Sequence, residues 1–313
     1  MGSTRLSCLC FAMSKLNRRL ALLGGLSAAG CVSAPAFPKE VAEFSLALQG
    51  RLPRQPPFLA VFQRGDQTLG FVAASHSIDP AHPTFSLVRA GFDQVQPVSV
   101  IIEGVGTALG ESPQPIARVV ARLKASQNPA SAGEALYTAL LAMEREIPVW
   151  GGEPSDQDIY AALLAAGSDP QDAFYASLFG PLEQSRREGA LTGPNDPRFD
   201  AVFERWAQAA AKGLAPVPDP SVRAFRTWYR DRTGLELADD PNWLANHDPD
   251  YAGPVQRENK LHMKIRDQHL FDLIQSQLDT HLRVLVVYGG SHIATMWGPL
   301  TCKLGQPRLI EEG

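Results

Sequence analysis

Two histidines and a glutamate stand where apolar segments of this 313-residue chain end. His76 follows FVAAS, Glu103 follows SVII and His292 follows VVYGGS. Two imidazoles and one carboxylate can bind a divalent metal ion and leave positions open for water or substrate. The same three groups could instead act as an acid–base set that activates water. Glu153, at the end of IPVWGGE, is a fourth candidate for this site.

The segment VVYGGSH, taken alone, favours a tight turn followed by a structural histidine. The three segments together favour a shared functional site instead. The segment RVLVVY (283–288) is mainly apolar and β-branched, which is typical of a strand buried on both faces. Because the carboxyl ends of parallel strands share one edge of a sheet, where open α/β proteins build their sites, we expect His76, Glu103 and His292 to converge.

The elements around these residues indicate an α/β fold. Residues 58–62 and 68–74 predict a β-hairpin around an Arg-Gly-Asp turn. Residues 83–95 have helical spacing, and 98–104 has the composition of the next buried strand. Strand, helix and strand in this order form a βαβ unit, which is expected to be parallel.

The middle of the chain is predicted to be helical, with Gly, Pro and Asp between the segments. The expected helices are 113–127, 131–146, 155–166, 170–187, 197–212 and 220–233, and a longer helix, 255–280, precedes the last strand. Residues 147–154 are a short strand candidate that contains Glu153. The fold class expected is therefore α/β, with a mainly parallel central sheet and flanking helices. A large helical insertion at about 111–250 would separate the early and late core strands of a single domain, 56–313.

The helix at 255–280 carries a polar stripe. At roughly 100° per residue, His262, Arg266 and His269 fall within about 60° of one another. Such a stripe could bind an anionic group or stabilise an oxyanion if it faces the strand ends. The alternative for the two histidines is a solvated helix face.

Three motifs together resemble the TraB/TIKI superfamily, a clan that also includes erythromycin esterases and ChaN-type haem-binding lipoproteins. GGSH at 289–292 matches the second histidine motif of that family, whereas AASH at 73–76 has Ala where the family has Gly. RDQHLFDLI at 266–274 resembles its Arg-Asn-x-x-Met-x-x-x-Ile helix, with Asp replacing Asn and Leu replacing Met. The resemblance covers about 56–110 and 255–300.

This resemblance implies a hydrolase that cleaves a peptide or ester bond. Glu103, His76 and His292 would surround either a divalent metal (Mn, Co, Fe or Zn) or a bare water molecule. Arg266, or backbone donors from Gly289 through Gly290 to Ser291, would hold the oxyanion. The alternatives are a ChaN-type lipoprotein that binds haem or another small-molecule ligand, and a scaffold that has lost its chemistry.

The N-terminus has the pattern of an export leader, expected at residues 1–31 and followed by a linker at 32–55. MSKLNRRLALLGGLSAAGC has a basic start, a short apolar core and small residues before Cys31. Ala-Ala-Gly-Cys resembles a bacterial lipoprotein box, so Cys31 is the expected lipidation site. Cleavage after Ala36 is the alternative, Met13 could replace Met1 as the start, and the paired arginines leave twin-arginine export open.

These features place the expected protein in the bacterial cell envelope. It would be exported to the periplasm and anchored to the membrane by lipid, with a peptide, ester or small molecule as its ligand. A net charge of −4 gives none of the basic footprint that a nucleic-acid partner requires. Processing at Cys31 would leave Cys302 as the single mature thiol, so no intramolecular disulfide is expected.

Overall fold

The computed structural model describes residues 40–126, 128–187, 189–248 and 250–311. The expected leader with Cys31, and the alternative cleavage after Ala36, lie outside these residues. Within the described ranges, no helix combines the length and the apolar character that a membrane span needs.

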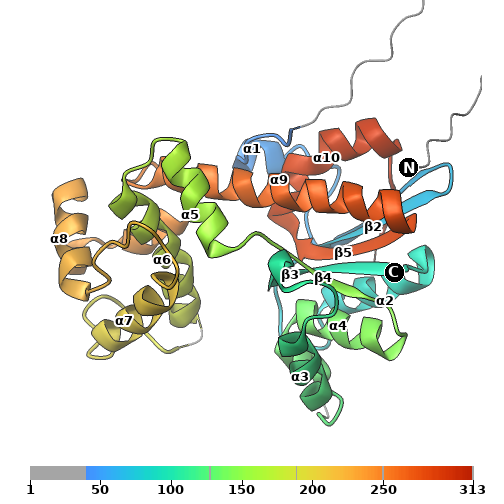
Figure 1. Cartoon of the computed structure of the whole chain (residues 1–313), viewed down its shortest axis with the longest axis horizontal. Coiled ribbons are helices and arrows are strands. Elements are labelled where there is room, and N and C mark those ends of the chain that lie inside the picture. Colours follow the sequence, from blue (N-terminus) through green and yellow to red (C-terminus); the bar gives the residue numbers. More distant parts are fainter. Residues whose placement is uncertain (1–39, 127, 188, 249, 312–313) are drawn as a thin grey trace, which may run out of the picture. The chain divides into compact units, whose positions relative to one another are not determined.

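A mixed sheet with the strand order β4-β3-β5-β2-β1-β6 forms the centre of the fold (Figure 1). The strands are β1 (Phe58–Arg64), β2 (Gln67–Ala74), β3 (Ser99–Gly106), β4 (Val149–Glu153), β5 (Arg283–Gly289) and β6 (Arg308–Ile310). Strands β4, β3, β5 and β2 run parallel, whereas β1 is antiparallel to both of its neighbours. The expected α/β fold with a mainly parallel sheet is therefore confirmed.

The last long strand occupies the middle of this sheet. Strand β5 lies between β2 and β3, with Val72 opposite Val287 and Ile102 also opposite Val287. Its residues from Val284 to Gly289 are all buried, as expected for a strand covered on both faces. Since β2, β5 and β3 are parallel and in register, their carboxyl ends meet at one edge.

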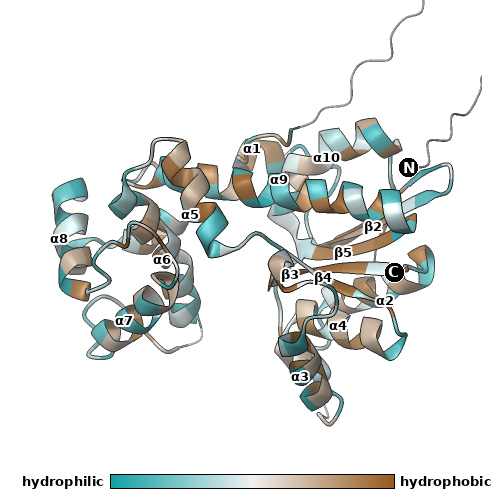
Figure 2. Cartoon of the chain, in the orientation of Figure 1, coloured by the Kyte–Doolittle hydropathy of each residue, from teal (hydrophilic) through white to brown (hydrophobic). Residues whose placement is uncertain are grey.

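Helices cover both faces of the sheet (Figure 1). The helices are α1 (Leu46–Gln49), α2 (Pro83–Val95), α3 (Gln114–Leu123), α4 (Glu134–Glu144), α5 (Asp156–Ala165), α6 (Pro170–Arg187), α7 (Phe199–Ala210), α8 (Val222–Thr233), α9 (Gln256–His281) and α10 (Gly290–Leu304), with short 3-10 helices at Thr107–Leu109, Pro129–Ala132, Leu237–Asp239 and Trp243–His247. Helices α9 and α10 pack on one face, and α2, α3 and α4 pack on the other. The apolar colouring of β3 and β5 in Figure 2 matches this burial on both sides.

The long helix α9 belongs to two hydrophobic cores. Leu270, Ile274 and Leu278 in its second half are buried against the sheet. Leu261 and Ile265 in its first half pack against a separate, aromatic-rich core built mainly by α5, α6, α7 and α8. The middle of α9, where Arg266 lies, is therefore held from both sides.

The residues before β1 differ from the sequence-based expectation. Residues 40–55 were expected as part of a linker, but Val41 and Leu52 are buried in the core under α9 and α10. These apolar side chains gain burial that a solvated linker would not give them. Within the expected insertion at about 111–250, the strand candidate at 147–154 is β4, which is the edge strand of the sheet.

Candidate functional site

The carboxyl edge of the parallel strands brings three predicted residues together. His76 follows β2 by two residues, Glu103 is in β3, and His292 lies in the first turn of α10, directly after β5. His76 Nε2 is 3.8 Å from Glu103 Oε2, and His292 Nε2 is 3.5 Å from Glu103 Oε1. Glu103 thus stands between two imidazoles that arrive from separate strands.

A second carboxylate holds each imidazole from behind. Glu134 Oε1, at the start of α4, is 2.5 Å from Nδ1 of His76. Asp267 Oδ1, on α9, is hydrogen-bonded to Nδ1 of His292. Because each Nδ1 is engaged by a carboxylate, each ring turns its Nε2 toward Glu103. This fixes the ring orientations without using the atoms that face the shared glutamate.

Neither of these supporting carboxylates was predicted as a functional residue. Asp267 lies inside the 266–274 segment that resembles a family motif, so a signal for it was present in the sequence. Its other oxygen accepts a hydrogen bond of 2.8 Å from the hydroxyl of Thr295. Glu134 begins a helix and follows no strand, and the sequence offers no comparable signal for it.

Glu103 is ionised and anchored. Gly289 N–H donates to its Oε2 at 2.6 Å, and Arg266 Nη2 donates to its Oε1 at 3.2 Å. Burial alone would raise the pKa of Glu103, but the hydrogen bond and charge of His292 and the charge of Arg266 hold it well below its usual range. A carboxylate with such a low pKa is a weak proton acceptor at neutral pH and a good partner for a cation.

Glu153 binds mainly to Arg266. The guanidinium of Arg266 donates to both of its oxygens, at 2.7 and 2.5 Å, and the hydroxyl of Tyr288 donates to Oε1 at 2.6 Å. Burial opposes ionisation of Glu153, yet the hydrogen bonds and charge of Arg266 lower its pKa. Arg266 in turn links Glu153 to Glu103, so the structure gives Arg266 a positioning role within the site.

Gly289 ends β5 and Gly290 begins α10, and each position needs glycine for a different steric reason. A Cβ on Gly289 would lie 3.1 Å from His76 Nε2 and 3.2 Å from Glu103 Oε2. A Cβ on Gly290 would lie 2.1 Å from Cγ of Pro56. Gly289 therefore keeps space open among the site side chains, and Gly290 lets α10 begin against the chain before β1. Ser291 follows, partly exposed, in the first turn of α10.

The histidine stripe of α9 does not join this group. His269 Nε2 is 2.8 Å from the hydroxyl of Thr107, which itself donates to Gly151 O at 2.5 Å. The hydroxyl oxygen therefore accepts a hydrogen bond that the Nε2–H of His269 donates. His262 lines a different pocket, enclosed by α5, α6 and α7. Of the three stripe residues, Arg266 alone contacts Glu103.

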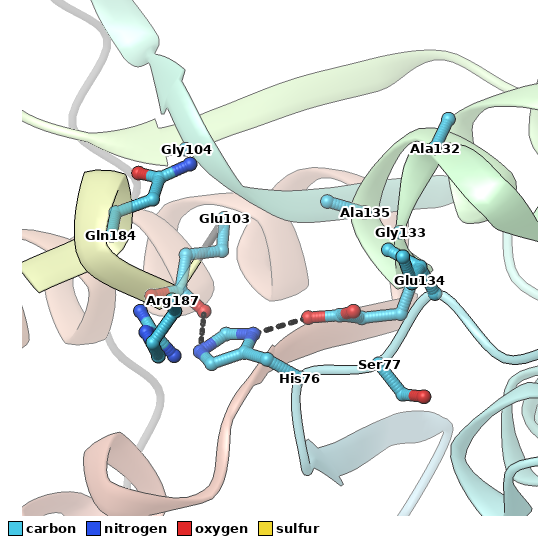
Figure 3. Close-up of a pocket in the computed structure, with 11 residues that line it drawn as sticks. His76, Ser77, Glu103, Gly104, Ala132, Gly133, Glu134, Ala135, Gln184 and Arg187 are labelled. Atoms are coloured by element: carbon cyan, nitrogen blue, oxygen red, sulfur yellow. Dashed lines mark hydrogen bonds and ion pairs between the residues drawn. The ribbon is translucent and has the colours of Figure 1, made fainter. Parts of the chain in front are cut away.

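A pocket of about 670 Å³ opens at His76 (Figure 3). The His76 side chain is 56% exposed, whereas His292 is 4% exposed. The pocket is lined by residues after β2 and in β3, by the start of α4 and by Gln184 and Arg187 of α6. A substrate in this pocket would therefore reach His76 and Glu103 first, with His292 behind them.

The pKa values of both imidazoles are raised by the carboxylates that surround them. The hydrogen bond from His76 to Glu134 raises the pKa of His76 against the effect of burial. Burial lowers the pKa of His292, but the charge and hydrogen bond of Asp267 outweigh it and raise that pKa to about 9. The negative carboxylates around the two rings therefore create a place that attracts positive charge.

No group of three or more His, Cys, Asp or Glu side chains among the described residues is already arranged around a metal position. Comparisons of the chain with protein-family models, with curated proteins and with solved structures gave no match. Any function must therefore be argued from the residues of this site.

Proposed function

We propose that the protein is a hydrolase of the TraB/TIKI type, which cleaves a peptide or ester bond at the group formed by His76, Glu103 and His292. One observation carries the proposal: two imidazoles, each held at Nδ1 by its own carboxylate, turn Nε2 toward one shared glutamate beside a pocket. A merely structural histidine does not need this arrangement twice around one carboxylate.

The residue types of this donor set suit a divalent metal. Two ligand atoms that each lie about 2.1 Å from one ion can be at most about 4.2 Å apart. The distances of 3.5 and 3.8 Å between the imidazole nitrogens and the Glu103 oxygens satisfy this limit. Carboxylates behind metal-bound imidazoles are also the usual outer partners of such sites. His76, His292 and Glu103 would hold Mn, Co, Fe or Zn, which would supply acidification of water and polarisation of a carbonyl.

The chain itself supplies orientation and charge. Gly289 N–H and Arg266 are already bonded to Glu103, so they hold that carboxylate in place. Because the first N–H groups of a helix lack partners within it, those at the start of α10, from Gly290 onward, are the donors that we expect at the oxyanion. Without an ion, His76 is the group best suited to accept a proton from water, because it lines the pocket and is steadied by Glu134.

We further propose that residues of about 111–250, which include α5 to α8, are an insertion between the early and late core strands, and that the protein is exported and lipid-anchored. The support for the anchor is the leader pattern ending at Cys31. Labelling of cells with a radioactive fatty acid tests it, because Cys31→Ser should lose the label while Cys302→Ser keeps it.

Metal content is the decisive measurement for the site. The protein without a histidine tag would be analysed for its elements beside His292→Ala and, as a control histidine outside the site, His281→Ala. We expect near-stoichiometric metal in the wild type and in the control, and its loss in His292→Ala. Peptide and ester substrates would then be screened, and Glu103→Ala should lose hydrolysis but not folding.

Haem titration examines the alternative function. A Soret band that disappears in His76→Ala, without hydrolysis by the wild type, would favour a haem-binding protein. If His76→Ala and His292→Ala both leave metal content, haem binding and hydrolysis unchanged, the shared site does not exist.

A further inference from the structure

A second pocket, of about 340 Å³, lies among α5, α6, α7 and α9. We call it the helical pocket; its lining includes Ile159, Leu163, Leu178, Trp206, Leu214 and His262. Most of the lining is apolar, and a concave apolar pocket with few polar groups is the usual form of a small-molecule site. Nothing in the proposed hydrolytic chemistry requires a pocket at this place.

His262 is the polar group aimed at this pocket. Its ring has no hydrogen-bond partner among the described residues, although the side chain is partly buried. Burial and the charge of Arg266 lower the pKa of His262 to about 4, so the ring is neutral at pH 7. A neutral imidazole offers one N–H donor and one nitrogen acceptor. Both are available to a ligand.

The charge around the helical pocket selects against anions. Asp156, exposed at the start of α5, is the sole charged side chain among the described residues that line it. With His262 neutral, an anionic ligand would meet one negative charge and no positive one. The lining therefore fits an uncharged, mainly apolar group that carries one hydrogen-bonding function.

Two helices connect the helical pocket to the candidate site. On α6, Ser177 and Pro181 line the helical pocket, whereas Gln184 and Arg187 line the pocket at His76. Steps of three or four residues keep these side chains on one face of the helix. On α9, His262 is four residues before Arg266, which contacts Glu103. The two pockets thus share α6 as a wall, and on α9 a residue of the helical pocket lies one turn before a residue of the candidate site.

We propose that the helical pocket binds the apolar part of the substrate, an uncharged acyl chain or ring whose hydrogen-bonding group meets His262. That this ligand is part of a substrate rests on the proposed function. The chemistry of the ligand is inferred from the pocket alone. It narrows the substrate class to esters or peptides with a bulky apolar group near the bond that is cleaved.

Calorimetric titration of the full-length protein with primary amides, from hexanamide to decanamide, tests the ligand chemistry. Each added methylene should tighten binding about four-fold until the pocket is full. Octanoate should bind more weakly than octanamide. Equal affinities for all chain lengths, or tighter binding of octanoate, would overturn the assignment.

Variants at pocket positions test whether octanamide binds in the helical pocket. Ala210→Trp should fill the helical pocket and abolish octanamide binding, whereas Ala201→Trp, at an exposed position of the same helix, should leave it unchanged. Ala209→Trp, at the exposed rim, serves if Ala210→Trp fails to fold. His262→Phe should weaken the binding of octanamide about three- to ten-fold by removing the hydrogen bond. Full binding by both pocket-filling variants would refute the location.

Ester hydrolysis separates this inference from the proposed function. With 4-nitrophenyl octanoate and acetate, Ala210→Trp should lower the octanoate-to-acetate ratio of kcat/KM, whereas Glu103→Ala should abolish both activities. Octanamide binding without any hydrolysis would contradict the proposed function and keep the pocket assignment. Hydrolysis with a ratio that Ala210→Trp does not change would contradict the pocket and keep the function.

Discussion

Replacing Asp267 by Asn should remove a pH dependence of stability that His292 gives to the metal-free protein. The side chain of His292 is 4% exposed, and that of Asp267 is fully buried. Burial lowers the pKa of His292, but the charge and hydrogen bond of Asp267 raise it to about 9 from an ordinary 6.5. The folded state therefore holds a proton that the unfolded state releases at lower pH.

The sign and size of the effect follow from this difference in pKa. Because the folded-state pKa is the higher one, the proton on His292 stabilises the fold fully below pH 6.5, and this contribution is lost as the pH rises toward 9. Each pH unit between the two pKa values corresponds to about 1.4 kcal/mol, so roughly 3 kcal/mol of unfolding free energy is at stake. Asn at position 267 keeps the shape of the side chain. Without the carboxylate, burial and the charge of Arg266 should lower the pKa of His292, with the hydrogen bond to Glu103 as the remaining opposing effect.

Urea unfolding at pH 6, 7, 8 and 9, after dialysis against a chelator, measures the effect. The wild type should lose most of this free energy between pH 6.5 and 9, and Asp267→Asn should show a flatter profile. Asp272→Asn, at an exposed position of the same helix, is the matched control and should follow the wild type. Identical profiles for wild type and Asp267→Asn would show that the carboxylate does not hold a proton on His292.

Four further outcomes are expected. Gly289→Ala should reduce metal content and hydrolysis about ten- to hundred-fold with little loss of stability, because its methyl would lie 3.1 Å from an imidazole nitrogen of the site. Gly290→Ala should instead lower the unfolding free energy by about 1–3 kcal/mol, because its methyl would collide with Pro56. Urea unfolding in which Gly289→Ala loses stability and Gly290→Ala does not would contradict the roles assigned to both glycines. Arg266→Ala should lower the unfolding free energy by about 3–5 kcal/mol by leaving two buried carboxylates without their cation, and Arg266→Lys should recover part of it. His262, whose pKa is lowered to about 4, favours its neutral form in the fold, so stability should fall as the pH falls from 6.5 to 4. Thermal unfolding at pH 7, 5 and 4 should show this loss in the wild type and a smaller one in His262→Gln.

The sequence by itself determined which side chains reach the edge of the sheet. The spacing of the apolar residues predicts a strand that ends near each of His76, Glu103 and His292. The strand–helix–strand order implies that these strands are parallel, so that their carboxyl ends meet at one edge of the sheet. The helix predicted at 170–187 has the same bounds in the structure. Asp and Pro mark its start, and the spacing of its apolar residues involves only positions a few residues apart. These features are local, so one segment at a time reveals them.

The tertiary structure decided what those side chains do. Glu134 reaches His76 across 58 positions of sequence, and Glu153 reaches Arg266 across 113. His262 and Arg266 share a helix face, yet one lines an apolar pocket and the other binds two carboxylates. No local pattern encodes these outcomes, because they depend on which distant segments pack against each residue. Partners, charge states and pockets are set by that packing.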